Sequence, residues 1–374
     1  MRVKKTNLQA VRVPVVPASV AGTQRIVFPI SAILFLALIL PAPVAAQPKP
    51  FMRQEKMTVE FLYSIEGVGG RGDRFRAPRD ISYDRAAEEL YVADAGRSAV
   101  LIFDRNGMFT QELRIDEKLG SPMLVATDGE GRIYVGHNRS AKISVLDFRG
   151  ELLDSYEIPG VVDLPGATVR PRYLASGPDG RVYALKTEGG LVGIDPFGEA
   201  HEEIVVGGEG APTSIYGFTI DPAGRLVFSN MRPAAVVIND RAEPPGTYEW
   251  FGSQGVIYGQ LARPQGVATD GAGHVFVSSL VRHNVLCYDA AGEFVEEFGG
   301  IGKQYGRFYM PGKIAHDGRD RLFVLETSLK RIQVFRVVFP DQQNKHAPNK
   351  AEGAHGAGPV AENDAWYSKQ GGSR

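Results

Sequence analysis

The sequence is poor in cysteine, because Cys287 is the only one among its 374 residues. A single thiol cannot form an intrachain disulfide, a four-thiolate zinc site or the C-x-x-C-H attachment site of a haem. We therefore expect no redox chemistry from this chain alone. Cys287 itself lies in an apolar run from Val285 to Tyr288, where a lone thiol is expected to be a small packing residue.

The chain also lacks an excess of charge of either sign. Its 42 Lys and Arg residues nearly balance its 43 Asp and Glu residues, and the net charge is −1. No global field therefore attracts nucleic acid or an anionic membrane, and neither is expected as a partner. A Gly-x-Ser-x-Gly elbow, a Walker loop and a His-Glu-x-x-His pair are absent too. Nucleophilic hydrolases, nucleotide enzymes and zinc proteases of those types thus have no support.

An apolar run from Ile26 to Leu40 stands near the start of the sequence. It is shorter than the ~20 residues that span a bilayer. Val44-Ala45-Ala46 follows it, and basic residues precede it at Arg2, Lys4, Lys5, Arg12 and Arg25. This pattern is typical of a secretory signal peptide. We expect residues 1–46 to be removed after Ala46, with an uncleaved membrane anchor as the alternative. The mature protein is then periplasmic or extracellular, with no stable membrane span.

Glycine and proline are abundant, at 44 and 24 residues, which indicates many tight turns and an all-β fold. The chain also repeats itself. One apolar triplet pattern recurs at intervals of 43, 49, 44, 49 and 47 residues. Its copies are Leu90-Tyr91-Val92, Ile133-Tyr134-Val135, Val182-Tyr183-Ala184, Leu226-Val227-Phe228, Val275-Phe276-Val277 and Leu322-Phe323-Val324. Repeats of this length are the signature of propeller blades, so we predict six of them.

Each repeat contains short apolar runs separated by turns that begin with Asp and end with Gly. Asp270-Gly271-Ala272-Gly273 is such a turn between the first two runs, and Asp289-Ala290-Ala291-Gly292 is one between the last two. Asp caps a turn of this kind and Gly adopts positive φ in it. The pattern predicts four antiparallel strands per blade.

The two ends of the repeat region complete one another. The sixth repeat stops after its third strand, Ile332 to Phe335, whereas an extra strand, Val59 to Ile65, precedes the first repeat. We expect this N-terminal strand to complete the last blade and close the ring, which removes an exposed sheet edge. The propeller then spans residues 57–340, after a linker at 47–56. Residues 341–374 have almost no apolar periodicity and are predicted to be a disordered tail.

These repeats resemble the NHL-repeat family over residues 57 to 340. The match rests on Tyr91-Val92-Ala93-Asp94 and Leu101-Ile102-Phe103-Asp104 in the first repeat, and on Gly266-Val267-Ala268 and Ile332-Gln333-Val334-Phe335 in the last two. The resemblance implies a six-bladed ring used mainly as a rigid interaction platform. Some similar propellers are metal-dependent lyases or lactone hydrolases, and fold alone does not decide between these functions.

The starts of the six first strands and the ends of the six second strands form two rings of candidate positions for a binding site. In each blade the first strand should start on the rim where the second strand ends, so the two rings should share one rim. A mouth built from them would suit a polar or anionic ligand, with Arg79, Arg172 and Lys313 as cationic contacts. The candidates at the strand starts are Arg79, Asp80, Arg172, Tyr173, Tyr216, Gln265 and Lys313. Those at the strand ends include Lys186 and Asn230. The alternative is that polar residues simply end strands at a wet surface.

Three functions stay open at this point. The leading hypothesis is a non-catalytic binding propeller that holds a protein partner on one face and needs no cofactor. The second is a lactonase-like or amidating-lyase-like enzyme with a divalent cation near Asp80, Asp94, His137 and Glu326, which the two rings place in neighbouring blades. The third is carbohydrate binding, with Tyr173 and Tyr216 as stacking residues.

Overall fold

The computed structural model describes residues 57–69, 73–158, 170–186, 190–195, 201–204, 206–207, 209–240 and 247–340. All elements in this part of the chain are β-strands, and no helix within it is long and apolar enough to cross a membrane. The predicted signal peptide, linker and tail, at 1–46, 47–56 and 341–374, lie outside the described residues.

The first blade shows the plan that the others repeat. Its strands are β2 (Pro78–Asp84), β3 (Glu89–Asp94), β4 (Ala99–Asp104) and β5 (Phe109–Arg114), which pair in chain order as one antiparallel sheet. The β-branched and aromatic residues of β3 and β4 favour extended backbone, and short polar turns join the strands.

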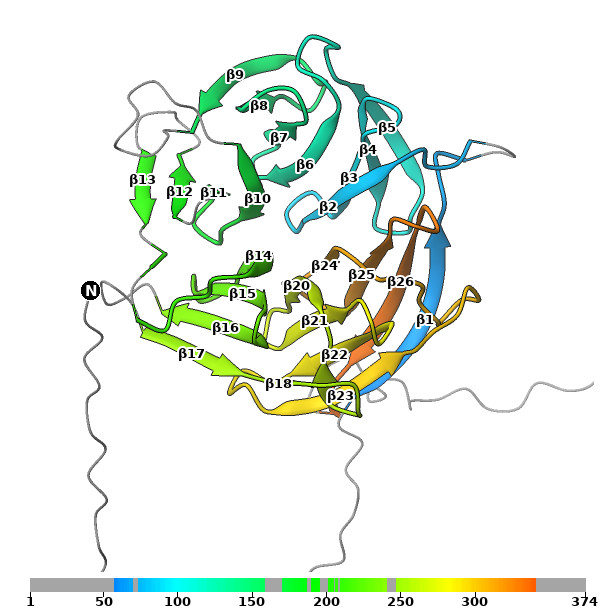
Figure 1. Ribbon diagram of the computed structural model, residues 1–374. Helices are drawn as coiled ribbons and strands as arrows, with labels where there is room; N and C mark the ends of the chain where they lie inside the picture. Colours follow the sequence, from blue (N-terminus) through cyan, green and yellow to red (C-terminus); the bar gives the residue numbers. More distant parts are fainter. Residues whose placement is uncertain are drawn as a thin grey trace, which may run out of the picture. The chain divides into compact units, whose positions relative to one another are not determined.

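Five further sheets of four strands complete the ring, as predicted (Figure 1). Blade 2 contains β6 (Pro122–Thr127), β7 (Ile133–His137), β8 (Lys142–Leu146) and β9 (Leu152–Glu157). Blade 3 contains β10 (Pro171–Ser176), β11 (Val182–Lys186), β12 (Leu191–Ile194) and β13 (His201–Ile204). Blade 4 contains β14 (Ile215–Ile220), β15 (Leu226–Met231), β16 (Ala234–Asp240) and β17 (Thr247–Phe251). Blade 5 contains β20 (Pro264–Thr269), β21 (Val275–Ser279), β22 (Asn284–Tyr288) and β23 (Phe294–Gly299). A short parallel pair, β18 (Ser253–Gln254) and β19 (Gln260–Leu261), lies in the linker before blade 5.

Blade 6 closes the ring in the predicted way. It contains β24 (Ile314–His316), β25 (Arg321–Glu326) and β26 (Arg331–Val338), and β1 (Thr58–Ile65) is its outermost strand. β1 runs antiparallel to β26, with Ile65 opposite Ile332. The ring is thus held shut by backbone hydrogen bonds between segments more than two hundred residues apart in the sequence.

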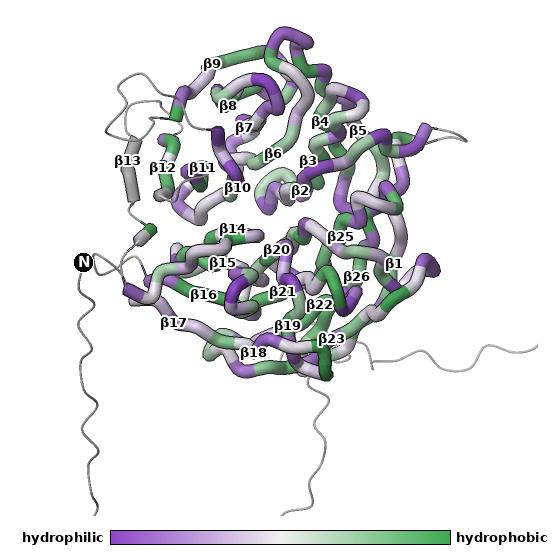
Figure 2. Tube along the Cα trace, viewed as in Figure 1, coloured by the Kyte–Doolittle hydropathy of each residue, from purple (hydrophilic) through white to green (hydrophobic). Residues whose placement is uncertain are grey.

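The core lies in the sheets and between neighbouring blades. Every residue of β7 and β22 is buried, whereas the outer strand β9 is largely exposed. One cluster joins Tyr91 and Val100 of blade 1 to Val135 of blade 2. In Figure 2 the hydrophobic parts of the trace lie mainly in the sheets, and many of the connections are hydrophilic. Full burial of each large apolar side chain in these clusters contributes about 1.5–3 kcal/mol to the stability of the fold.

Asp and Gly shape the turns as predicted. Asp221 Oδ1 accepts hydrogen bonds from the amides of Ala223 and Arg225, at 3.0 and 2.8 Å, and Gly224 has a φ of 83°. The same Asp-to-amide bonds are made by Asp84, Asp104, Asp128, Asp147, Asp179, Asp270, Asp289 and Asp317. These turns follow the first and third strands, and the rim they form is called the turn face.

The opposite rim, called the linker face, is where each first strand starts and each second strand ends. Pro78 lies opposite Asp94, Pro122 opposite His137, Pro171 opposite Lys186, Ile215 opposite Asn230 and Pro264 opposite Ser279. The two rings of candidate positions therefore share one rim, as expected.

Candidate functional site

The residues that end the second strands bind the backbone of the linkers. Asp94 is fully buried, and its carboxylate accepts hydrogen bonds from the amides of Arg76, Ala77 and Gly96, at 2.7, 2.7 and 3.1 Å. Asn230 accepts one from the Ser214 amide at 2.8 Å. These side chains hold the linker against its own blade, so their polarity serves the fold.

Glu326 has the same role in blade 6. It is fully buried and accepts hydrogen bonds from Arg331 Nε at 2.6 Å, Gln333 Nε2 at 2.7 Å and the Tyr309 amide at 2.7 Å. Its charge is thus compensated within the protein, by a cation that is itself buried.

The four residues named as metal ligands are not brought together. Asp94 and Glu326 have the partners just described, Asp80 Oδ1 lies 3.3 Å from Lys313 Nζ, and His137 Nε2 lies 2.8 Å from Ser144 Oγ. Within the described ranges no group of three His, Cys, Asp or Glu side chains is arranged to hold a metal ion. The neighbouring blades do place these residues on one rim, but their side chains point to different partners.

Two buried histidines make stability depend on pH. Burial lowers the pKa of His137 and of His316 to about 4, from an ordinary value of 6.5. Between these values the unfolded chain binds more protons than the folded one, so stability present above pH 6.5 is lost as the pH falls toward 4. We expect urea unfolding to show a loss of roughly 2–3 kcal/mol in the free energy of unfolding per histidine between pH 7 and pH 4.5.

Carboxylates also titrate in this pH range, so the test compares wild type with the double variant His137→Gln/His316→Gln. An equal pH dependence of the free energy of unfolding in the two proteins would contradict the conclusion that these histidines cause the loss.

Other candidates do gather on the linker face. Lys313 Nζ lies 4.3 Å from the centre of the Tyr173 ring, which belongs to the opposite blade. The Arg172 guanidinium lies over the rings of Tyr173 and Tyr216, at 5.7 and 5.2 Å. Cations over aromatic faces are attracted by the ring quadrupole. Lys313 also pairs with Asp80. Burial raises the pKa of Asp80, and the positive charge of Lys313 reduces this increase.

A cavity of about 590 Å³ adjoins this cluster and adds two arginines that the sequence interpretation missed. Tyr216, Arg232 and Arg263 line it. Arg263 precedes the first strand of blade 5 and Arg232 follows the second strand of blade 4. Both rings of candidates, extended by two residues from Gln265 and from Asn230, would have included them. We call Arg172, Tyr173, Tyr216, Arg232, Arg263 and Lys313 the linker-face patch.

The remaining candidates from the sequence make none of the contacts that define the linker-face patch. Arg79 is exposed and Gln265 is half-buried, with its amide donating to the Pro264 carbonyl at 3.1 Å. Lys186 and Asn230 are buried at the ends of their strands. Asn230 also donates to the Pro233 carbonyl at 2.9 Å, which fixes the connection that carries Arg232.

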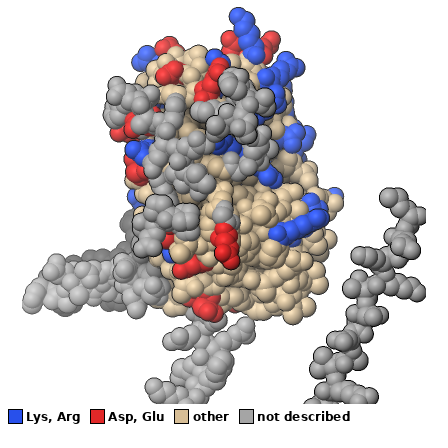
Figure 3. Space-filling view, turned by 60° about the vertical axis from the view of Figure 1, so that its left-hand side comes forward, with Lys and Arg blue, Asp and Glu red and all other residues tan. Residues whose placement is uncertain are grey.

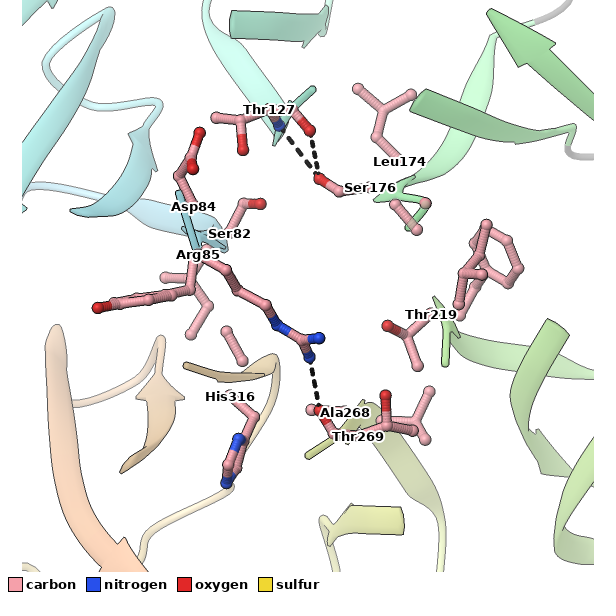
Figure 4. Close-up of a pocket in the computed structure, with 18 of the residues that line it drawn as sticks. Ser82, Asp84, Arg85, Thr127, Leu174, Ser176, Thr219, Ala268, Thr269 and His316 are labelled. Carbon is pink, nitrogen blue, oxygen red and sulfur yellow. Dashed lines mark hydrogen bonds between the residues drawn. The ribbon is translucent and has the colours of Figure 1, made fainter. Parts of the chain in front are cut away.

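A second cavity, of about 340 Å³, lies between the first strands on the ring axis (Figure 4). Asp80 and Lys313 are at its linker-face end, and Asp84, Arg85 and His316 are at the other. The candidate rings included Asp80 and Lys313 but not Asp84, Arg85 and His316 at the turn-face end. A signal was present in the last position of four of the first strands, which holds Thr127, Ser176, Thr269 and His316 in place of an apolar residue.

No family model and no curated protein matches the chain, so membership of the NHL-repeat family stays a prediction. Solved β-propeller structures are similar to it. One is a structural-genomics protein from Bacteroides thetaiotaomicron, with a TM-score of 0.55 and 15% identity over 75% of this chain and 76% of that one. A gluconolactonase from Xanthomonas campestris has a TM-score of 0.54 and 13% identity over 75% of this chain and 99% of that one. Virginiamycin B lyase from Staphylococcus aureus has a TM-score of 0.52 and 12% identity over 76% of this chain and all of that one.

At these identities the likeness shows the fold alone. The chain is therefore a six-bladed β-propeller, of an architecture that a lyase and a lactonase also use.

Proposed function

We propose that this protein is an exported, non-catalytic binding propeller that holds an acidic segment of a protein partner on its linker face. Its compartment is then the periplasm or the cell exterior. The observation that supports the proposal is that the arginines of the linker-face patch form no ion pair with the described residues, whereas Arg97 and Arg282 on the same face do.

Arginines of the linker-face patch have no carboxylate partner among the residues that the structure describes. Arg232 and Arg263 are exposed, and neither forms an ion pair or a side-chain hydrogen bond with any part of the chain that the structure describes. Arg172 lies over the rings of Tyr173 and Tyr216 and forms no ion pair with the described residues. The carboxylate that contacts the patch, Asp80, is buried and pairs with Lys313.

Arginines of the turn face are mostly paired. Arg132 Nε lies 2.8 Å from Asp128, Arg225 Nε lies 2.7 Å from Asp221, and Arg105 lies 3.1 Å from Asp320. The turns need their aspartates as caps, so carboxylates lie within reach of the arginines on this rim. In Figure 3 Lys and Arg gather along the right-hand edge, whereas most Asp and Glu lie in the middle and on the left. The near-zero net charge thus conceals an uneven distribution.

The patch suits carboxylates that arrive on a partner. Arginine binds carboxylates through two parallel N–H donors, and aromatic side chains with arginine are common at the centres of protein interfaces. The Tyr173 ring is fixed in place, because it is buried and Lys313 packs on it. A rigid surface loses little entropy on binding.

Binding of a fluorescently labelled decaglutamate peptide tests the proposal. We expect saturable binding at about 50 mM salt that weakens strongly at about 300 mM, because the contacts are between exposed charges. An uncharged Gly-Ser peptide of the same length is the control probe. Absence of saturable binding at low salt, or equal binding of the uncharged peptide, would contradict the proposal.

A metal-dependent lyase or lactone hydrolase stays the alternative that the resemblance implies. The positions of Asp80, Asp94, His137 and Glu326 do not favour it, because the described side chains are engaged with separate partners.

A further inference from the structure

The cavity on the ring axis has the size and the exposed chemistry of a small-ligand site. Its volume of about 340 Å³ is at the lower end of the range of ligand pockets, roughly 300–1,000 Å³. Each first strand pairs with another strand on one side only, so its other edge faces the axis. Some backbone groups of this edge bond to the neighbouring blade, as those of Thr127 do to the Ser176 hydroxyl (Figure 4), and the remaining ones can bond to a ligand. Ser82 and Thr219 line the cavity as well and add half-buried hydroxyl groups.

Arg85 brings a positive charge into this cavity. Its side chain extends from blade 1 toward the axis, and its guanidinium donates to the Thr269 carbonyl of blade 5 at 2.9 Å (Figure 4). It makes no ion pair in the described chain. The carboxylates that act on it, Asp317 and Asp270, are engaged elsewhere, by the amides of their turns and, for Asp270, by His274 at 2.7 Å. A guanidinium has five N–H donors, and one neutral carbonyl satisfies few of them.

The accessible polar groups of the cavity are Arg85 and two hydroxyl groups. Arg85 is exposed and lines the cavity, so its remaining N–H donors require an acceptor. The hydroxyls of Ser82 and Thr219 are half-buried in the same wall and can both donate and accept. A ligand with a carboxylate and several hydroxyl groups can bond to all three.

We propose that this cavity binds a monosaccharide-sized sugar acid. The ligand's carboxylate lies against the Arg85 guanidinium, and its hydroxyl groups bond to the hydroxyls of Ser82 and Thr219 and to backbone groups at the inner edges of the first strands. The cavity reaches the linker-face patch at Lys313, but Arg85 is at its opposite end, so the inference does not depend on the proposed function.

Calorimetric titration with D-glucuronate tests this inference. D-glucose, which lacks the carboxylate, and acetate, which lacks the hydroxyls, are the matched probes. We expect saturable glucuronate binding that is at least about tenfold tighter than that of either control. Arg85→Met keeps the length of the side chain and removes its charge, and it should weaken glucuronate binding about tenfold or more. Arg149→Met, on an exposed turn, is the control variant and should bind as wild type does.

Three results would overturn the inference. They are no saturable glucuronate binding up to about 10 mM, acetate binding as tight as that of glucuronate, and unchanged binding by a folded Arg85→Met protein. Thermal unfolding establishes that the variant is folded. Decaglutamate binding is unaffected by any of these results, so the two proposals succeed or fail separately.

Discussion

Replacement of Glu326 by alanine lowers the free energy of unfolding by about 3–5 kcal/mol, which is the largest stability effect we expect from one substitution. Removal of the carboxylate leaves the buried Arg331 guanidinium uncompensated and deprives Gln333 and the Tyr309 amide of their acceptor. The damage falls on blade 6, where the ends of the propeller are joined through β1 and β26.

Urea unfolding of Glu326→Ala beside Glu60→Ala measures this effect. Glu60 pairs with Arg336 in the same blade, at 2.9 Å, but its side chain is 60% exposed. Exposed pairs of this kind contribute only about 0–1 kcal/mol. Equal losses in the two variants would show that the Glu326 network does not stabilise the ring closure.

The fold was predictable from the sequence because its determinants are local. Asp caps the turns and Gly takes positive φ in them, as at Asp221 and Gly224, so each hairpin is encoded within a few residues. The ring closure followed from counting strands, since β1 had no other place to pair. Neither inference needed knowledge of side-chain contacts.

The candidate site was only partly predictable, because a strand-end residue has two possible uses. Asp94 can face a ligand or bind the linker that folds back over it, and the choice depends on the loop conformation. The contact of Lys313 with Tyr173 joins opposite blades, and no local pattern reports a contact across the axis. The same holds for Arg85, whose partner is in blade 5.

Reversal of the two exposed arginines of the linker-face patch is the change with the largest expected effect on binding. Arg232→Glu/Arg263→Glu replaces two attractive contacts with two repulsive ones beside the acidic peptide. At about 1 kcal/mol or more for each lost contact, decaglutamate affinity should fall by about thirtyfold or more. Both side chains are exposed and without hydrogen bonds to described residues, so the fold should not change.

The matched control carries the same change in net charge on the opposite rim. Arg149→Glu/Arg319→Glu alters two exposed arginines of the turn face. If only the net charge mattered, both double variants would lose the same decaglutamate affinity. If the peptide binds the linker-face patch, only Arg232→Glu/Arg263→Glu loses much affinity.

Fluorescence anisotropy of labelled decaglutamate against wild type and both double variants, at low salt, is the most direct test of the linker face as the binding surface. The account predicts a loss of about thirtyfold for Arg232→Glu/Arg263→Glu and less than about threefold for Arg149→Glu/Arg319→Glu. Equal affinities in the two double variants, or a larger loss from the turn-face pair, would contradict it.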